Sequence, residues 1–162
     1  MWGIAPDFRP IIVPKWDKCE QMFLGEFTHS IDSKGRLTIP AKFRGDLAAG
    51  LVVTRGFDRN LMMFPLSSWK TLAEEMMSRP LSDLDMRTFR RRVFSAAMDL
   101  APDRQGRILL PQYLRDFAGI DDEVVITGMY NYLEIWSVET WENERDAIEN
   151  SDDAARWSAL GI

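Results

Sequence analysis

The sequence is poor in the residues that build covalent cross-links and metal centres. It has 1 cysteine and 1 histidine among 162 residues. A lone cysteine, Cys19, excludes an internal disulfide framework and suits a reducing compartment. One histidine and one cysteine leave little material for a transition-metal site. We therefore expect neither a bound metal nor a cofactor.

Long apolar runs and catalytic constellations are missing as well. No stretch approaches the roughly 18 to 20 apolar residues of a membrane helix. His29 has no serine and acid partners in a triad pattern, and neither a phosphate-binding loop nor a dinucleotide-binding glycine pattern occurs. The composition, 46% hydrophobic and 28% charged, is ordinary for a soluble globular chain. We expect a non-enzymatic cytoplasmic protein with no membrane contact.

The chain contains an internal repeat, and this is its most informative feature. Asp32-Ser33-Lys34-Gly35-Arg36 is followed by a short apolar stretch that ends at Pro40, and Asp103-Arg104-Gln105-Gly106-Arg107 is followed by a similar stretch that ends at Pro111. An internal repeat of this kind predicts two similar half-domains, each presenting the same basic turn. The match continues through these pairs: Phe23 with Phe94, Arg44 with Arg115, Val52-Val53 with Val124-Val125, Gly56 with Gly128, Leu61 with Leu133, Trp69 with Trp141.

Each half predicts strands followed by a helix. The first repeat is expected over 22–80, a connecting helix over 81–93, the second repeat over 94–150 and a frayed tail over 151–162. Leu84, Phe89 and Val93 are expected to form the apolar face of the connecting helix, with its arginines pointing outward. Trp69, Trp136 and Trp141 are expected to fill core or interface positions, and the pairs Met62-Met63 and Met76-Met77 are expected to serve packing. Residues 1–21 match nothing in the second half, so we expect a flexible extension or translated sequence upstream of a true start at Met22.

The Asp-x-x-Gly-Arg motif has a mechanical interpretation. Asp32 and Asp103 can accept hydrogen bonds from backbone amides of their own turn. Gly35 and Gly106 permit a positive φ angle. The arginine then leaves the turn at the start of a strand, where its guanidinium can bind a phosphate or a guanine edge. Alternatively, Arg36 simply forms a salt bridge with Asp32. Two copies with matching strands favour the binding interpretation.

The net charge of −5 is unusual for a protein that binds nucleic acid. The charge is unevenly spread, however. Each turn carries two cations, Lys34 and Arg36 in the first turn and Arg104 and Arg107 in the second. The acidic residues gather from Glu139 to Asp153. Local potential governs binding more than net charge, because screening acts within about 10 Å.

The residues just described closely resemble the MraZ family of bacterial transcriptional regulators. The segments that carry the resemblance are Met22-Phe23-Leu24-Gly25-Glu26-Phe27, Ile31-Asp32-Ser33-Lys34-Gly35-Arg36, Pro40-Ala41-Lys42-Phe43-Arg44, Val53-Thr54-Arg55-Gly56, Phe94-Ser95-Ala96-Ala97, Asp103-Arg104-Gln105-Gly106-Arg107 and Leu133-Glu134-Ile135-Trp136. They extend from Met22 nearly to the C-terminus.

The resemblance implies an α+β fold of two tandem swapped-hairpin repeats of the SpoVT–AbrB type, with a pseudo-two-fold β-barrel core and peripheral helices. It implies ring-shaped homo-oligomers that bind short direct repeats in duplex DNA upstream of the protein's own division and cell-wall gene cluster, in association with the nucleoid. The DNA-contacting residues implied are Lys34, Arg36, Arg104 and Arg107, on loops shaped by Asp32, Gly35, Asp103 and Gly106. The alternative is an antitoxin-like module of the same fold that binds a partner protein.

Overall fold

The computed structural model describes residues 22–151 and 153–161. The first half contains these elements, in order: β1 (Glu26–Ser30), β2 (Arg36–Thr38), the 3-10 helix η1 (Ala41–Phe43), α1 (Arg44–Leu47), β3 (Leu51–Arg55), β4 (Leu61–Pro65), α2 (Leu66–Ser78). The second half contains these: α3 (Leu84–Phe94), β5 (Met98–Leu100), β6 (Arg107–Leu109), α4 (Gln112–Ala118), β7 (Glu123–Gly128), β8 (Leu133–Ser137), α5 (Val138–Asn150), α6 (Ala154–Ala159). The expectation for residues 1–21 lies outside the described ranges.

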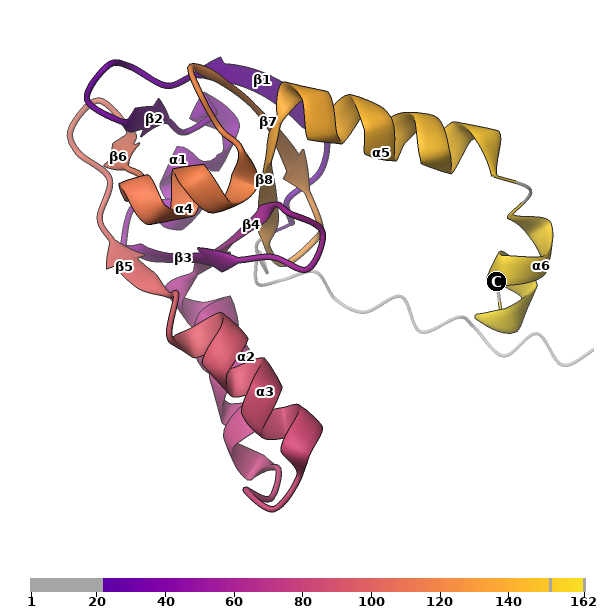
Figure 1. Cartoon of the computed structure of the whole chain (residues 1–162). Helices are drawn as coiled ribbons and strands as arrows, with labels where there is room; N and C mark the ends of the chain where they lie inside the picture. The colour runs from indigo at the N-terminus through magenta and orange to yellow at the C-terminus, as the bar shows by residue number, and fades with distance from the viewer. Residues whose placement is uncertain (1–21, 152, 162) are drawn as a thin grey trace, which may run out of the picture.

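The two halves exchange strands. A six-stranded sheet has the order β1-β7-β8-β4-β3-β5, and β2 pairs with β6 in a separate two-stranded ladder. The first strand of each half therefore lies against the third strand of the other half, and every pairing is antiparallel. The halves are thus one folded unit, because neither sheet is complete without strands from both (Figure 1).

The pairing register reveals a pseudo-two-fold relation between the halves. Leu37 pairs with Ile108 at the centre of the β2–β6 ladder, and Arg36 and Arg107 lie on either side of that pair. In the large sheet, Met62 pairs with Glu134 in the centre of the β4–β8 contact. Both central pairs join corresponding residues of the two repeats, so the pseudo-two-fold axis passes through both ladders.

The third strands of the two halves, β3 and β7, align with a shift of one residue relative to the match found in the sequence. Burial in β3 begins at Leu51, whereas in β7 it begins at Val124 after the exposed Glu123. Thr54 pairs with Met62, and Thr127 pairs with Glu134. Thr54 and Thr127 are therefore structural counterparts, and the expected match of Val52-Val53 with Val124-Val125 is displaced by one position.

The main core lies between the inner face of the large sheet and the small ladder with its short helices. Side chains alternate between the two faces of a strand, so Leu61 and Met63 face this core while Met62 and Phe64 face outward. Leu37 and Ile108 close the core from the ladder side. A second apolar cluster on the outer face of the sheet contains Met62, Phe64, Val93, Trp69, Leu72, Phe89, Phe94 and Tyr132.

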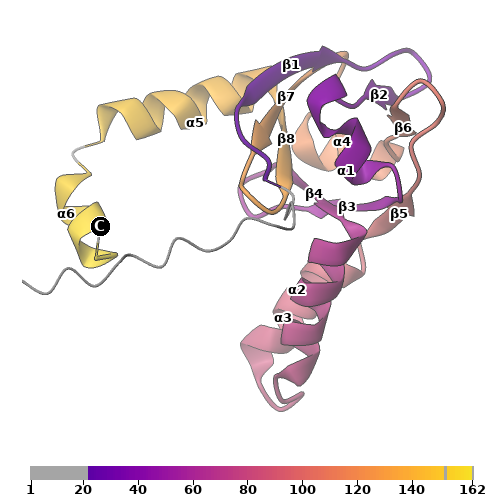
Figure 2. The ribbon, with the colours of Figure 1, turned by 180° about the vertical axis from the view of Figure 1, so that it is seen from behind.

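Two helical elements project from this body in different directions, as both views show (Figures 1 and 2). One is the hairpin of α2 and α3, and the other is the arm of α5 and α6. The tail that we expected to be frayed contains α6. Asp83 caps the start of α3 by accepting a hydrogen bond from the Met86 N–H. Of the expected apolar face of α3, Val93 is buried and Phe89 packs on the outer cluster, but Leu84 is 69% exposed.

The α+β class expected from the sequence is confirmed. A closed barrel is not formed among the described residues, because β1 and β5 are the edge strands of the large sheet and the three-residue strands β2 and β6 form a separate sheet. The expected barrel core is therefore corrected to two antiparallel sheets that enclose one core. Met62, Met63 and Trp136 are buried as expected, whereas Met77 is 63% exposed, contrary to expectation.

Candidate functional site

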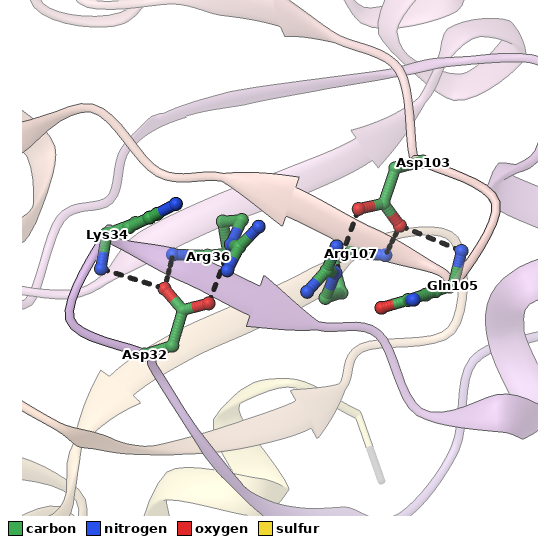
Figure 3. Close-up of polar contacts among 6 residues, drawn as sticks. All are labelled: Asp32, Lys34, Arg36, Asp103, Gln105 and Arg107. Atoms are coloured by element: carbon green, nitrogen blue, oxygen red, sulfur yellow. Dashed lines mark hydrogen bonds and ion pairs between the residues drawn. The ribbon is translucent and has the colours of Figure 1, made fainter.

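The first Asp-x-x-Gly-Arg loop is organised around the carboxylate of Asp32. Its Oδ1 accepts hydrogen bonds from the backbone N–H groups of Lys34 at 3.0 Å and Arg36 at 2.9 Å. Its Oδ2 accepts a hydrogen bond from Arg36 Nε at 2.6 Å, which is also an ion pair. One side chain thus closes the turn and holds the arginine (Figure 3).

The second loop repeats this geometry. Asp103 Oδ1 accepts hydrogen bonds from the N–H groups of Gln105 and Arg107, both at 2.9 Å, and Oδ2 accepts one from Arg107 Nε at 2.8 Å. Figure 3 shows the two carboxylates toward opposite ends of the β2–β6 ladder and the two arginines between them. The site therefore consists of two copies of one arrangement about the pseudo-two-fold axis.

The two glycines make this turn possible. Gly35 has φ +83° and Gly106 has φ +73°, a left-handed backbone conformation that costs other residues roughly 1–2 kcal/mol. Each glycine also joins the two loops through the backbone. The Ile39 N–H donates to the Gly106 carbonyl at 2.8 Å, and the Leu110 N–H donates to the Gly35 carbonyl at 2.9 Å. The loops are thereby locked to each other as well as shaped internally.

Arg44 and Arg115 are parts of the site that sequence reasoning did not assign. A Cβ on Gly106 would lie 2.5 Å from Arg44 Nε, and one on Gly35 would lie 2.7 Å from Arg115 Nη2. Each arginine therefore covers the loop of the opposite repeat. Arg44 Nε also donates to the Ile39 carbonyl at 2.9 Å, and Arg115 Nε donates to the Leu110 carbonyl at 3.1 Å. The signal in the sequence was their matched position eight residues after each loop arginine.

Arg36 and Arg107 point to the same side of the small ladder. Residues paired directly across an antiparallel ladder share a face, and so do alternate residues of a strand. Arg36, Thr38, Arg107 and Leu109 consequently form the outward face, while the buried Leu37 and Ile108 form the inward face. Since each ion pair uses Nε, the terminal amino groups of both guanidinium groups remain able to bind a further acceptor.

The loop carboxylates stay ionised at neutral pH. The pKa of Asp32 is lowered from 3.8, mainly by the hydrogen bond from the Arg36 N–H. Desolvation is the second-largest effect and raises this pKa, but hydrogen bonds from the Arg36 side chain and the Lys34 N–H lower it further. The Arg107 N–H and side chain lower the pKa of Asp103 in the same way. Because the pKa of each carboxylate is lower in the folded state than in the unfolded state, the ionised carboxylates stabilise the fold at neutral pH. This stabilisation is lost as the pH falls through the folded-state pKa.

The remaining predicted site residues lie at the loop tips. Lys34 and Arg104 are both exposed. They are not counterparts, since Lys34 corresponds to Gln105 and Arg104 corresponds to Ser33. Each tip thus carries one additional cation, displaced by one position. The salt bridge between Arg36 and Asp32, which was the alternative interpretation of Arg36, is also present in the structure. It does not exclude binding, because it uses only Nε of the guanidinium.

The arginines of the connecting helix α3 mainly make hydrogen bonds within the protein. Arg90 Nη2 donates to the carbonyls of Met76 and Arg79, so it joins α3 to α2. Arg87 Nη1 donates to the Leu81 carbonyl, and Arg92 Nη2 donates to the Gly56 carbonyl. Arg92 is exposed as expected, whereas Arg90 is half-buried and lies against α2, contrary to the expectation. These arginines thus satisfy carbonyl groups at the end of α2, in the α2–α3 connection and in the β3–β4 connection.

In the part of the chain that the structure describes, His29 and the acidic residues form no metal site. The pKa of His29 is lowered by burial and by the charge of Arg44, so this side chain is neutral at pH 7. Within the described residues, no group of three or more histidine, cysteine or acidic side chains is placed to hold a metal ion. In those same residues, no helix has the length and apolar character needed to span a bilayer.

Comparison with known proteins places the chain in a family. The family model described as "MraZ protein, putative antitoxin-like" matches residues 22–92 and again residues 93–159. A Transcriptional regulator MraZ from Herpetosiphon aurantiacus is 48% identical over 143 residues, which cover 87% of this chain and 100% of the relative. A protein of the same name from Roseiflexus castenholzii is 51% identical over 79% of this chain and 90% of its own length. Another from Thermomicrobium roseum is 49% identical over 86% of this chain and 99% of its own length.

This chain belongs to the MraZ family, and the resemblance found in its sequence is confirmed. The doubled match of the family model also confirms the internal repeat. The curated relatives are named as transcriptional regulators.

Proposed function

We propose that this protein is a sequence-specific regulator of transcription that binds duplex DNA through its two Asp-x-x-Gly-Arg loops. The observation that carries the proposal is the pair of identical arginine arrangements on the outward face of the β2–β6 ladder. A guanidinium held at Nε presents its terminal amino groups in a fork that matches a phosphate or the O6 and N7 atoms of guanine. Lys34 and Arg104 supply further contacts with phosphates.

The duplicated geometry suits DNA because duplex DNA presents equivalent features on its two strands. Two loops related by a two-fold axis can approach both strands of one groove in the same way. Holding each arginine by an aspartate in the free protein reduces the entropy lost on binding. We therefore assign Arg36 and Arg107 to base or phosphate contact and Asp32 and Asp103 to positioning.

An oligomer resolves the conflict with the acidic net charge of −5. In a ring of copies of this chain, each subunit presents another pair of loops, and neighbouring subunits bind neighbouring direct repeats. Each additional contact then forms at high effective concentration, so individually weak contacts give tight binding. We propose that the target repeats lie upstream of the division and cell-wall gene cluster that contains this gene, and that the folded halves adopt the swapped-hairpin arrangement of the family. Binding there would associate the protein with the nucleoid.

Fluorescence anisotropy with DNA from upstream of this gene tests the proposal. The wild-type chain should bind this DNA more tightly than scrambled DNA, and the affinity should fall as salt rises. Arg36→Ala should weaken binding by about 1–3 kcal/mol, which is roughly 5- to 150-fold. Lys70→Ala is the matched control, because Lys70 lies on α2 away from the loops and is 78% exposed. Equal losses in both variants would contradict the assignment of Arg36.

A second candidate function follows from the antitoxin-like description of the family model. In that case the arginine face would bind an acidic surface of a partner protein. The same titration distinguishes the two functions, because a protein-binding module should show no preference for the upstream DNA over scrambled DNA at any salt concentration.

A further inference from the structure

Arg44 belongs to the first repeat, yet its side chain lies against the loop of the second. A Cβ placed on Gly106 would lie 2.5, 2.6 and 3.1 Å from Nε, Cδ and Cζ of Arg44. The planar end of this arginine therefore occupies the space that a side chain at position 106 would need. Phe43 and Leu47, its neighbours on η1 and α1, are buried in the core. The arginine thus reaches the opposite loop from a fixed base.

Hydrogen bonds continue from Arg44 to the loop arginine of the second repeat. Arg44 Nε donates to the Ile39 carbonyl at 2.9 Å, and the Ile39 N–H donates to the Gly106 carbonyl at 2.8 Å. The Gly106 N–H donates to the Asp103 carbonyl at 3.0 Å, and the Asp103 N–H donates to the Arg107 carbonyl at 2.8 Å. Arg44 is thus connected to Arg107 through a backbone path that crosses from one repeat to the other.

Arg115 repeats this arrangement in the opposite direction. A Cβ on Gly35 would lie 2.7, 2.9 and 3.2 Å from Nη2, Cζ and Nε of Arg115. Arg115 Nε donates to the Leu110 carbonyl at 3.1 Å, and the Leu110 N–H donates to the Gly35 carbonyl at 2.9 Å. The Gly35 N–H donates to the Asp32 carbonyl at 2.9 Å, and the Asp32 N–H donates to the Arg36 carbonyl at 3.1 Å. The same contact therefore occurs twice, each time between the two repeats.

The chemistry of this contact requires arginine. Among the long cationic side chains, only arginine combines a donor at Nε with a planar guanidinium that can lie flat on a backbone without a Cβ. Lysine carries the same charge, but its donors lie at the end of a flexible chain. It therefore cannot hold the carbonyl and cover the glycine at the same time, and charge alone cannot replace Arg44 or Arg115.

We propose that Arg44 and Arg115 are positioning residues that act across the repeats, Arg44 on the loop of Arg107 and Arg115 on the loop of Arg36. A side chain that binds a ligand needs neighbours whose own positions are fixed. The aspartate of each loop holds the arginine within that loop, whereas the crossing arginine holds the loop against the other half. This inference rests on the proposed function and adds two positioning residues to its site.

Arginine-to-lysine variants test the crossed pairing, because they keep the charge and remove the contact. In anisotropy titrations with the upstream DNA, Arg44→Lys and Arg115→Lys should each weaken binding roughly fivefold. Arg44→Lys should cause no further loss in the Arg107→Ala background, but it should still cost about fivefold in the Arg36→Ala background. Arg115→Lys should show the reverse pattern. Residues in one network are coupled in this way, whereas the losses at independent sites multiply to within about twofold.

Arg91→Lys is the matched control for the substitution. Arg91 is exposed on α3, which Figure 1 shows away from the β2–β6 ladder, so this variant should bind like the wild type. Losses that multiply in all four double variants would indicate direct contact of Arg44 and Arg115 with DNA and would overturn the proposal. Wild-type affinity in the lysine variants, or coupling to the loop arginine of the same repeat, would overturn it as well.

Hydrogen exchange measured without DNA separates this inference from the proposed function. The Arg44→Lys chain should exchange faster than the wild type within 103–107 and at the wild-type rate within 32–36. The Arg115→Lys chain should show the opposite. Equal changes in both loops, or no change in either, would overturn the positioning contact. If exchange shows the crossed pattern while the wild-type chain does not prefer the upstream DNA, the proposed function fails and the contact between the repeats is supported.

Discussion

Asp32 and Asp103 are the residues on which the local geometry of the site depends most. Each uses one carboxylate oxygen to hold two backbone N–H groups and the other to hold the guanidinium of its arginine. Both lie beside the cationic face that we propose for DNA, where a negative charge by itself opposes binding. The structure therefore separates two effects of the same side chain: repulsion of phosphate and orientation of arginine.

Asp32→Asn should weaken DNA binding even though it removes a negative charge. The asparagine carbonyl can still accept the backbone hydrogen bonds, but its amide group would face Arg36 Nε, so the arginine loses its fixed orientation. We expect affinity to fall roughly tenfold, equivalent to about one hydrogen bond to a charged group. Unfolding stability should change little, because exposed ion pairs contribute little. Anisotropy titration measures the affinity, and tighter binding by the variant would show that charge alone governs the site.

Gly35→Ala should destabilise the fold without abolishing it. The substitution forces a left-handed backbone on alanine and places its Cβ against the end of the Arg115 side chain. We expect a loss of about 1–2 kcal/mol in urea unfolding, mainly from the backbone conformation. Gly45→Ala is the control, because Gly45 lies in α1 with no atom within 4 Å of an added Cβ. That change should be neutral or stabilising, and equal losses at both positions would contradict the argument.

At the scale of elements, the exchange of strands between the repeats decides how the loops are placed. β2 and β6 have only three residues each, and two such short strands form a marginal ladder on their own. The ladder is held because Leu37 and Ile108 are buried in the core that the large sheet provides. The loop arginines are thus positioned by strands from both halves.

The counterparts Thr54 and Thr127 provide a matched test of what a buried threonine hydroxyl contributes to stability. Thr54→Val should cost about 1 kcal/mol or more, because it leaves the buried Val93 carbonyl without its hydroxyl donor. Thr127→Val should be neutral or stabilising, since the hydroxyl it removes has no partner among the described residues. Chemical unfolding of both variants measures the difference. A larger loss for Thr127→Val would show that its hydroxyl is satisfied in solution.

At the scale of the whole molecule, the pseudo-two-fold axis makes the two loops equivalent in shape but not in tip charge. Arg36 and Arg107 share one face, so a single subunit can present both to the same DNA. The tip cations are displaced by one position between the loops. The two loops should therefore make similar arginine contacts and different contacts beyond them.

A double-variant measurement shows whether both loops of a subunit bind at once. If they do, Arg36→Ala and Arg107→Ala should each weaken binding by about 1–3 kcal/mol, and the double variant should lose close to the sum. The dependence of affinity on salt should also become less steep with each arginine removed. An Arg107→Ala variant with wild-type affinity and salt dependence would show that only the first loop contacts DNA.

Residue type and spacing predicted the repeat and the internal geometry of each loop, and the resemblance to the MraZ family implied the α+β class. The Asp-x-x-Gly-Arg turn depends on atoms of five consecutive residues, so its chemistry is visible in the sequence. Likewise, the strands of each half were expected because short apolar runs bounded by turn residues are typical of buried strands.

Only the tertiary structure decided which strands pair and which residues support the loops. β1 lies against β7, nearly a hundred residues away, and the β3–β7 correspondence is shifted by one residue. Such pairings are chosen by the whole core and not by local periodicity, which is similar in every strand. For the same reason, the crossing of Arg44 and Arg115 to the opposite loop, and the exposed ends of the two projecting elements, emerge only when both halves are folded together.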